Sequence, residues 1–261
     1  MTSRAQYAGL TALLVATLVL VAFALRTPAA PTGSGSSVAR PTPTSASPSP
    51  SVSEASPSEP VAIGEGAKVA FVGDSFAAGA GASGEQARWT TVLSAAHKWS
   101  EDNLGRAGTG YLRAGRTENC TPQNCPAYPG LVGQIVADRP ALVVITGGGN
   151  DLGQDLTQLG AAVTQTVKGI KDGVPGVRVV VTNPWWDMRP YDQRLATYTQ
   201  AIQKAATDAG AVWVDTAQPV MGKPDLMTAD GMQPNDRGHE AIATSVGRGL
   251  EQAGLIAKAA Q

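Results

Sequence analysis

Ser75 is the residue whose type and position best suit nucleophilic chemistry. It follows the short apolar run Val69–Val72 and the turn residues Gly73 and Asp74. Ligand crevices in open α/β sheets form at the carboxyl ends of the strands. A serine hydroxyl placed there lies near backbone N–H groups, so it could attack a carbonyl carbon while those groups hold the resulting oxyanion. Gly, Asp and Ser are also common in turns, so a purely structural role is the alternative.

Between about Val61 and Gln261, short apolar runs alternate with amphipathic segments, and these segments must position Ser75. Four apolar runs are expected to form buried strands: Val69–Val72, Ala141–Thr146, Val177–Thr182 and Ala211–Val214. Amphipathic spacing predicts helices over Ala87–Trp99, Leu131–Val136, Leu156–Ile170, Gln193–Ala209 and Gly238–Ala253. This alternation indicates a parallel sheet covered on both faces. We therefore expect one three-layer α/β/α domain, flavodoxin-like, over residues 61–261.

Polar or glycine-rich residues follow several of the expected strands and extended segments. These are Asp74-Ser75, Gly105–Gly110, Gly149-Asn150 and Trp185-Trp186. In a parallel sheet these strand ends share one edge. The sequence therefore predicts one site assembled from distant segments.

Three of these blocks resemble the conserved blocks of the SGNH hydrolases, also called GDSL esterases and lipases. Gly73-Asp74-Ser75 is similar to the nucleophile block, although Phe76 replaces its usual leucine; Asn103-Leu-Gly-Arg-Ala-Gly108 and Gly148-Gly-Asn150-Asp151 are similar to the second and third. The resemblance implies that Ser75 is the nucleophile. It also implies that the N–H of Gly108 and the amide of Asn150 donate to the oxyanion. It extends over nearly all of Val69–Gly249.

The last block departs from this family pattern, which is Asp-Gly-x-His-Pro followed by a second Gly-His. Here the sequence is Asp230-Gly-Met-Gln233-Pro, with His239 six residues after Gln233. The resemblance assigns Asp230 to the orienting carboxylate and puts Gln233 where the catalytic histidine stands. An amide has no basic pKa near neutrality, so it cannot take the serine proton. His239, backed by Asp236 or Asp230, is the candidate replacement base; His97 is a second candidate but is expected to be structural.

Trp185, Trp186, Met188 and Tyr191 follow a strand end on the edge expected to hold the site. They could line a pocket for an acyl chain or a sugar ring, or pack over the sheet as core. The glycines of Gly105–Gly110 are not in the G-x-G-x-x-G order, and no acidic residue follows at ribose-binding spacing. No dinucleotide, other organic cofactor or metal is expected.

The first sixty residues predict export rather than a folded domain. Tyr7–Leu25 is an uncharged, mostly apolar run preceded by Arg4, so residues 1–26 are expected to be a signal peptide or a membrane anchor. Residues 27–60 are rich in Pro, Ser and Thr and predict a disordered linker. In an extracytoplasmic protein, Cys120 and Cys125 are expected to form a small disulfide loop, with zinc binding as the alternative.

The net charge of −1 and the pI of about 6.1 make nucleic acid an unsuitable partner. The function that these features favour is serine-dependent hydrolysis of carboxylic esters outside the cytoplasm. Acyl or acetyl esters of cell-envelope glycans or lipids are candidate substrates because of the expected location. Three alternatives remain open: acyl transfer, a non-catalytic binding domain that lost its base at Gln233, and a surface scaffold. The sequence does not indicate an oligomeric state.

Overall fold

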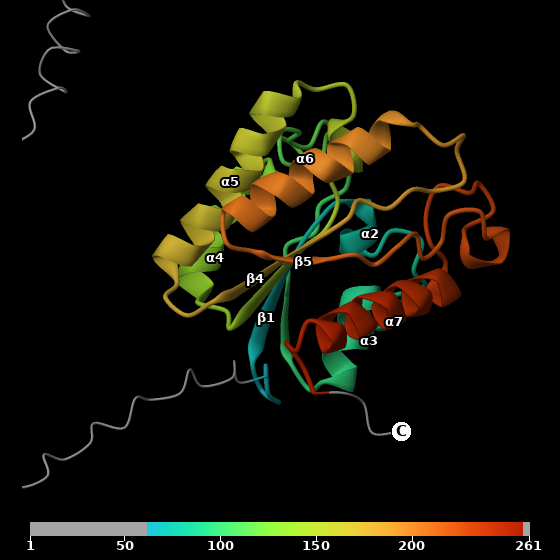
Figure 1. The fold of residues 1–261 in the computed structure, drawn as a ribbon. Helices are drawn as coiled ribbons and strands as arrows, with labels where there is room; N and C mark the ends of the chain where they lie inside the picture. The colour runs from blue at the N-terminus through green and yellow to red at the C-terminus, as the bar shows by residue number, and fades with distance from the viewer. Residues whose placement is uncertain (1–61, 258–261) are drawn as a thin grey trace, which may run out of the picture. The chain divides into compact units, whose positions relative to one another are not determined.

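The computed structural model describes residues 62–257, which form a five-stranded parallel sheet with the order β2-β1-β3-β4-β5 (Figure 1). The strands are β1 (Lys68–Val72), β2 (Ser100–Asn103), β3 (Leu142–Ile145), β4 (Arg178–Thr182) and β5 (Val212–Val214). All four strand pairs are parallel. This is the flavodoxin-like strand order, and it confirms the predicted fold class.

The composition of each strand follows from its place in the sheet. The central strand β3 has the sequence Leu-Val-Val-Ile and is buried along its whole length. This pattern is typical of a parallel strand covered on both faces. In contrast, β2 has the sequence Ser-Glu-Asp-Asn and lies at one edge of the sheet. An edge strand needs to bury less of its surface, so polar residues are tolerated there.

Helices cover both faces of the sheet (Figure 1). One face packs against α4 (Val132–Asp138), α5 (Leu156–Gly173) and α6 (Arg194–Asp208); the other packs against α3 (Trp89–Ala96) and α7 (Asp236–Gln252). Side chains alternate between the two cores: Ala70 and Val72 of β1 belong to the first, and Val69 and Phe71 to the second. This alternation follows from the two-residue period of a strand.

One predicted helix is shorter in the structure, and a second, short helix follows β1 directly. The helix predicted over Ala87–Trp99 is shorter, because α3 ends at Ala96 and Lys98 adopts a left-handed backbone conformation with φ of 53°. After β1 the chain forms one short helix, α2 (Ser75–Ala78), which ends at Gly79. Ser75 is therefore the first helical residue after the strand.

The signal peptide or anchor predicted over residues 1–26 and the whole linker predicted over 27–60 lie outside the described residues. Within residues 62–257, no helix combines the length and the apolar character that a membrane span requires. Export therefore stays a prediction from the sequence.

Candidate active site

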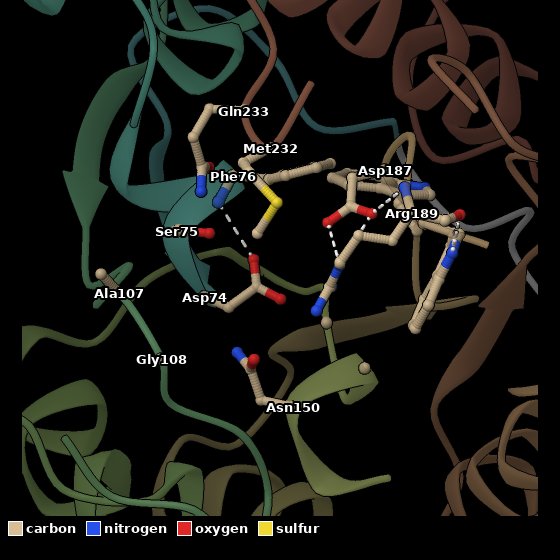
Figure 2. A pocket seen from close by; sticks show the side chains of 14 residues that line it. Asp74, Ser75, Phe76, Ala107, Gly108, Asn150, Asp187, Arg189, Met232 and Gln233 are labelled. Atoms are coloured by element: carbon tan, nitrogen blue, oxygen red, sulfur yellow. Dashed lines mark hydrogen bonds and ion pairs between the residues drawn. The ribbon is translucent and has the colours of Figure 1, made fainter. Parts of the chain in front are cut away.

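A pocket of about 260 Å³ lies where the chain leaves the carboxyl ends of four strands. Its walls come from four strand ends and from the turn before α7 (Figure 2). The lining residues are 74–76 after β1, 107–108 after β2, Gly147, Gly149 and Asn150 after β3, 185–187 and Arg189 after β4, and Met232 and Gln233 from the turn. Ser75, Gly108 and Asn150 all line this pocket. Asp230 and His239 do not.

Ser75 is positioned by a tight turn between β1 and α2. A Cβ atom on Gly73 would lie 2.5 Å from the Thr146 side chain and 2.5 Å from Ala77 Cβ, so only glycine fits at this position. The Phe76 N–H donates to Asp74 Oδ1 at 3.0 Å, which makes Asp74 the N-cap of α2. The strand, the glycine and the cap together fix Ser75 at the pocket wall.

Gly108 and Asn150 line the same pocket as Ser75. Gly108 has a φ of 75°, in the left-handed region that favours glycine. Asn150 Nδ2 donates one hydrogen bond to the Thr109 carbonyl at 2.9 Å. Because an amide nitrogen has two hydrogens, its second N–H can donate to an oxyanion in the pocket.

Asp151 holds the loop that contains Gly108. Its carboxylate accepts hydrogen bonds from the backbone N–H groups of Tyr111, Leu112 and Arg113 at 2.7, 3.0 and 3.1 Å. Burial raises the pKa of this carboxyl, although the three hydrogen bonds act in the opposite direction. A Cβ atom on Gly110 would lie 2.5 Å from the same carboxylate, so the close approach requires glycine. Asp151 thereby positions the loop next to its neighbour Asn150.

Cys120 and Cys125 form a disulfide in the structure, so neither is free to bind zinc. The Gly115 N–H donates to the Cys125 carbonyl at 2.8 Å, and Cys120 Sγ lies 3.7 Å from the Ala107 carbonyl oxygen. The disulfide loop therefore contacts the segment that contains Gly108. Within residues 62–257, no three His, Cys, Asp or Glu side chains are grouped so that they could hold a metal ion.

Gln233 lines the pocket, and its amide points toward Ser75 (Figure 2). Among the described residues, its buried Oε1 atom has no hydrogen-bond partner. An amide can donate or accept a hydrogen bond here, but it cannot take a proton. The side chain next to Ser75 is therefore polar and not basic.

His239 does not fit the expected role of replacement base. The ring is fully buried; Nδ1 accepts from the Trp89 N–H at 3.4 Å, and Nε2 lies 3.1 Å from the Ala80 carbonyl. This pattern assigns the proton to Nε2, which donates to Ala80, and leaves neither nitrogen free for Ser75. Burial lowers the pKa of the imidazole, which favours the neutral ring. His239 is a structural residue that joins α7 to the segments around α2 and α3.

Asp230 and His97 also lie apart from the pocket. Asp230 is exposed, and its Oδ1 accepts from the Met232 N–H at 3.0 Å and from the Thr228 hydroxyl at 2.7 Å, which lowers the pKa of its carboxyl. It stabilises a turn and orients no histidine. His97 stacks on Trp99 with 4.7 Å between the ring centroids at the end of α3. Neither residue lines the Ser75 pocket.

Trp185 and Trp186 line the pocket, but only 8% and 7% of their surfaces are exposed. The Trp185 indole donates to the Thr216 hydroxyl at 2.7 Å, and its ring packs edge-on against Trp89. Both side chains therefore pack mainly as part of the core, and they do not form an open aromatic surface. Met188 and Tyr191 are exposed and lie outside the pocket lining.

Asp74 is a pocket residue that the sequence interpretation left without a chemical role. Burial raises the pKa of its carboxyl from an ordinary 3.8 to about 6; the Phe76 N–H acts in the opposite direction, and the nearby charge of Asp151 adds to the rise. The position of Asp74 directly before Ser75 could have suggested a chemical role. Its burial could not be deduced from residue types.

The Asp74→Asn variant is expected to be more stable than the wild type at pH 7, by up to about 3 kcal/mol. The asparagine oxygen can still accept the Phe76 N–H. Because the pKa of Asp74 is raised in the folded state, its ionisation lowers stability as the pH rises from about 4 to about 6. Urea unfolding of both proteins at pH 4, 5, 6 and 7 measures the difference. A difference that stays constant over this range would contradict the assignment.

A family model described as GDSL-like lipase/acylhydrolase matches residues 71–241, more than half of the chain. The GDSL lipase Rv0518 of Mycobacterium tuberculosis is 26% identical over 189 residues, which cover 68% of this chain and 79% of that protein. The residues matched by the family model include all the segments that form the pocket walls.

Solved structures share the fold at lower identity. The psychrotrophic esterase EstA from Pseudoalteromonas sp. superimposes with a TM-score of 0.56 at 17% identity, covering 72% of this chain and 98% of that chain. The salicylyl-acyltransferase SsfX3 from a tetracycline biosynthetic pathway has a TM-score of 0.59 at 20% identity, covering 74% of this chain and 56% of that chain. At these identities the likeness shows a common fold.

Proposed function

The chain belongs to the GDSL-like lipase/acylhydrolase family, and on this premise we propose that it hydrolyses carboxylic esters with Ser75 as the nucleophile. The main support is that Ser75, Gly108 and Asn150 line one pocket. Ser75 Oγ attacks the ester carbonyl, the bond to the alcohol breaks, and water then hydrolyses the acyl-serine. The N–H groups of Ser75 and Gly108 and the Asn150 amide stabilise the negative charge on the carbonyl oxygen.

Asp74 is the proposed proton acceptor for Ser75, directly or through one water. The ionisable groups in the pocket lining are Asp74, Asp187 and Arg189, and Asp187 is ion-paired with Arg189. A carboxylate with a pKa of about 6 can accept a proton near neutrality more readily than an ordinary aspartate. The reaction is expected to be slower than in enzymes with a histidine base.

We propose an extracytoplasmic location, where acyl or acetyl esters of envelope glycans or lipids would be available. The apolar run Tyr7–Leu25 supports export. The Cys120–Cys125 disulfide is also typical of an oxidising compartment.

Hydrolysis of 4-nitrophenyl acetate by the wild type, Ser75→Ala and Asp74→Asn tests this proposal. The wild type is expected to turn over with a kcat/KM that rises with pH through about 6, since Asp74 must be ionised to accept the proton. Ser75→Ala should abolish the activity, and Asp74→Asn should remove most of it together with the pH dependence. Equal activity in Ser75→Ala would exclude the hydrolase mechanism. An unchanged pH profile in Asp74→Asn would exclude Asp74 as the acceptor.

A binding domain is the second candidate, and the amide of Gln233 beside Ser75 favours it. A wild-type protein that fails to turn over esters but binds them in the Ser75 pocket would support this function. Acyl transfer differs from hydrolysis only in whether an alcohol or water attacks the acyl-serine. Product analysis in the presence of added glycerol distinguishes these two reactions.

A further inference from the structure

Arg189 presents a positive charge in the wall of the Ser75 pocket and is held from two sides. Its Nε–H donates to both carboxylate oxygens of Asp187, at 2.9 and 2.8 Å, and its backbone N–H donates to Oδ1 at 2.9 Å. The guanidinium carbon lies 4.8 Å from the centre of the Trp186 ring, in cation–π geometry. The Arg189 side chain is therefore pre-oriented before any substrate binds.

The residues that hold Arg189 are themselves fixed. Asp187 and Trp186 are only 5% and 7% exposed. The Trp186 indole N–H donates to the Arg189 carbonyl at 3.0 Å, and the Trp186 backbone N–H donates to Gln218 Oε1 at 2.8 Å. Gln218 follows β5, so two strand ends brace the segment that presents Arg189.

The outer edge of the guanidinium remains available. Within residues 62–257 neither Nη group has a hydrogen-bond partner, and 53% of the Arg189 side chain is exposed. Figure 2 shows the guanidinium end of Arg189 pointing into the pocket. The two Nη groups form a planar fork that matches a carboxylate with two parallel hydrogen bonds.

We propose that Arg189 is a carboxylate-binding subsite, so that the preferred substrates are esters that also carry a carboxylate. This inference rests on the proposed ester chemistry of Ser75 and specifies the substrate class for that site. Among the residues that line the pocket, Arg189 is the one cation and Asp74 and Asp187 are carboxylates, so the attraction for a substrate carboxylate comes from the Arg189 guanidinium alone. The pocket volume of about 260 Å³ indicates a short carboxylate-bearing group.

Arg194 offers a matched control variant. It pairs with Asp192 at the same spacing along the chain, with Nε 3.0 Å from Oδ1 and Nη2 2.6 Å from Oδ2. Its side chain is 63% exposed, and neither residue lines the pocket. Arg194→Gln therefore removes a similar ion pair without changing the proposed subsite.

The test compares substrate pairs that differ in charge, using the full-length wild type, Arg189→Gln and Arg194→Gln. Monoethyl adipate against diethyl adipate places the carboxylate on the acyl side; 4-acetoxybenzoate against methyl 4-acetoxybenzoate places it on the alcohol side. For at least one pair, the ratio of kcat/KM for the charged to the neutral ester should fall roughly ten- to a hundredfold in Arg189→Gln, as expected for a charge-assisted bidentate contact. Arg194→Gln should keep the wild-type ratio. Ratios within about twofold of wild type for both pairs in Arg189→Gln would overturn the proposal.

A binding measurement separates this inference from the hydrolase proposal. Monoethyl adipate is titrated into Ser75→Ala and followed by the NMR signal of the Trp186 indole N–H, which contacts Arg189. A saturable shift that is lost in the Ser75→Ala, Arg189→Gln double variant supports the subsite even if no ester is turned over. Ester turnover without any dependence on charge or on Arg189 would instead support hydrolysis and overturn the subsite.

Discussion

Replacing Gln233 with histidine is expected to raise kcat/KM for 4-nitrophenyl acetate by roughly 100- to 10 000-fold, the usual contribution of a positioned general base. Gln233 points toward Ser75 from the pocket wall, so an imidazole at this position would have a nitrogen within reach of the hydroxyl. Its charged form could then donate the proton to the leaving alcohol. The measurement is kcat/KM from pH 5 to pH 9, where the variant should show a new dependence near the pKa of histidine.

Gln233→Asn is the matched control, since it changes the side chain but adds no base. The Ser75→Ala, Gln233→His double variant shows whether the gain passes through Ser75. A folded Gln233→His protein with wild-type activity would mean that Ser75 is not oriented for attack.

Asn150→Ala is expected to lower kcat by roughly 100- to 1000-fold, because it removes one of three donors to the oxyanion. The effect should be largely in kcat, since the contact strengthens as charge develops on the carbonyl oxygen. The Gln233→His background gives a higher starting rate, so the loss can be measured accurately there.

Asn150 also bonds to the Thr109 carbonyl, so stability must be measured in parallel. Loss of that bond is expected to cost about 1 kcal/mol in unfolding free energy. Asn119→Ala, at an exposed position outside the pocket, is the control variant. A rate loss below tenfold would show that the amide does not contact the oxyanion.

The fold could be predicted because strong local patterns agree with the global arrangement. Runs such as Leu142–Ile145 have few places to lie except inside a covered parallel sheet. Parallel strands also place their carboxyl ends at one edge, which explains why Ser75, Gly108 and Asn150 were expected together. The limits of α3 were less predictable, because the left-handed conformation of Lys98 is not evident from residue type.

The rest of the site depends on contacts between residues that are distant in sequence. The spacing of His239 from Asp236 and Gln233 is visible in the sequence and suggested a replacement base. Its hydrogen bonds with Trp89 and Ala80 arise from helix packing, which the sequence does not show. The role of Arg189 could not be deduced in the same way, because its orientation depends on how the segment after β4 is braced by Gln218.

Labelling of the full-length protein with an alkyl fluorophosphonate, read by intact mass and peptide mapping, tests whether Ser75 is an activated nucleophile. Such a reagent modifies a serine that is nucleophilic and faces an oxyanion hole. We expect a single adduct on Ser75 that is absent from Ser75→Ala and forms faster in Gln233→His. An unmodified Ser75 after prolonged exposure, or an equal adduct in Ser75→Ala, would contradict it.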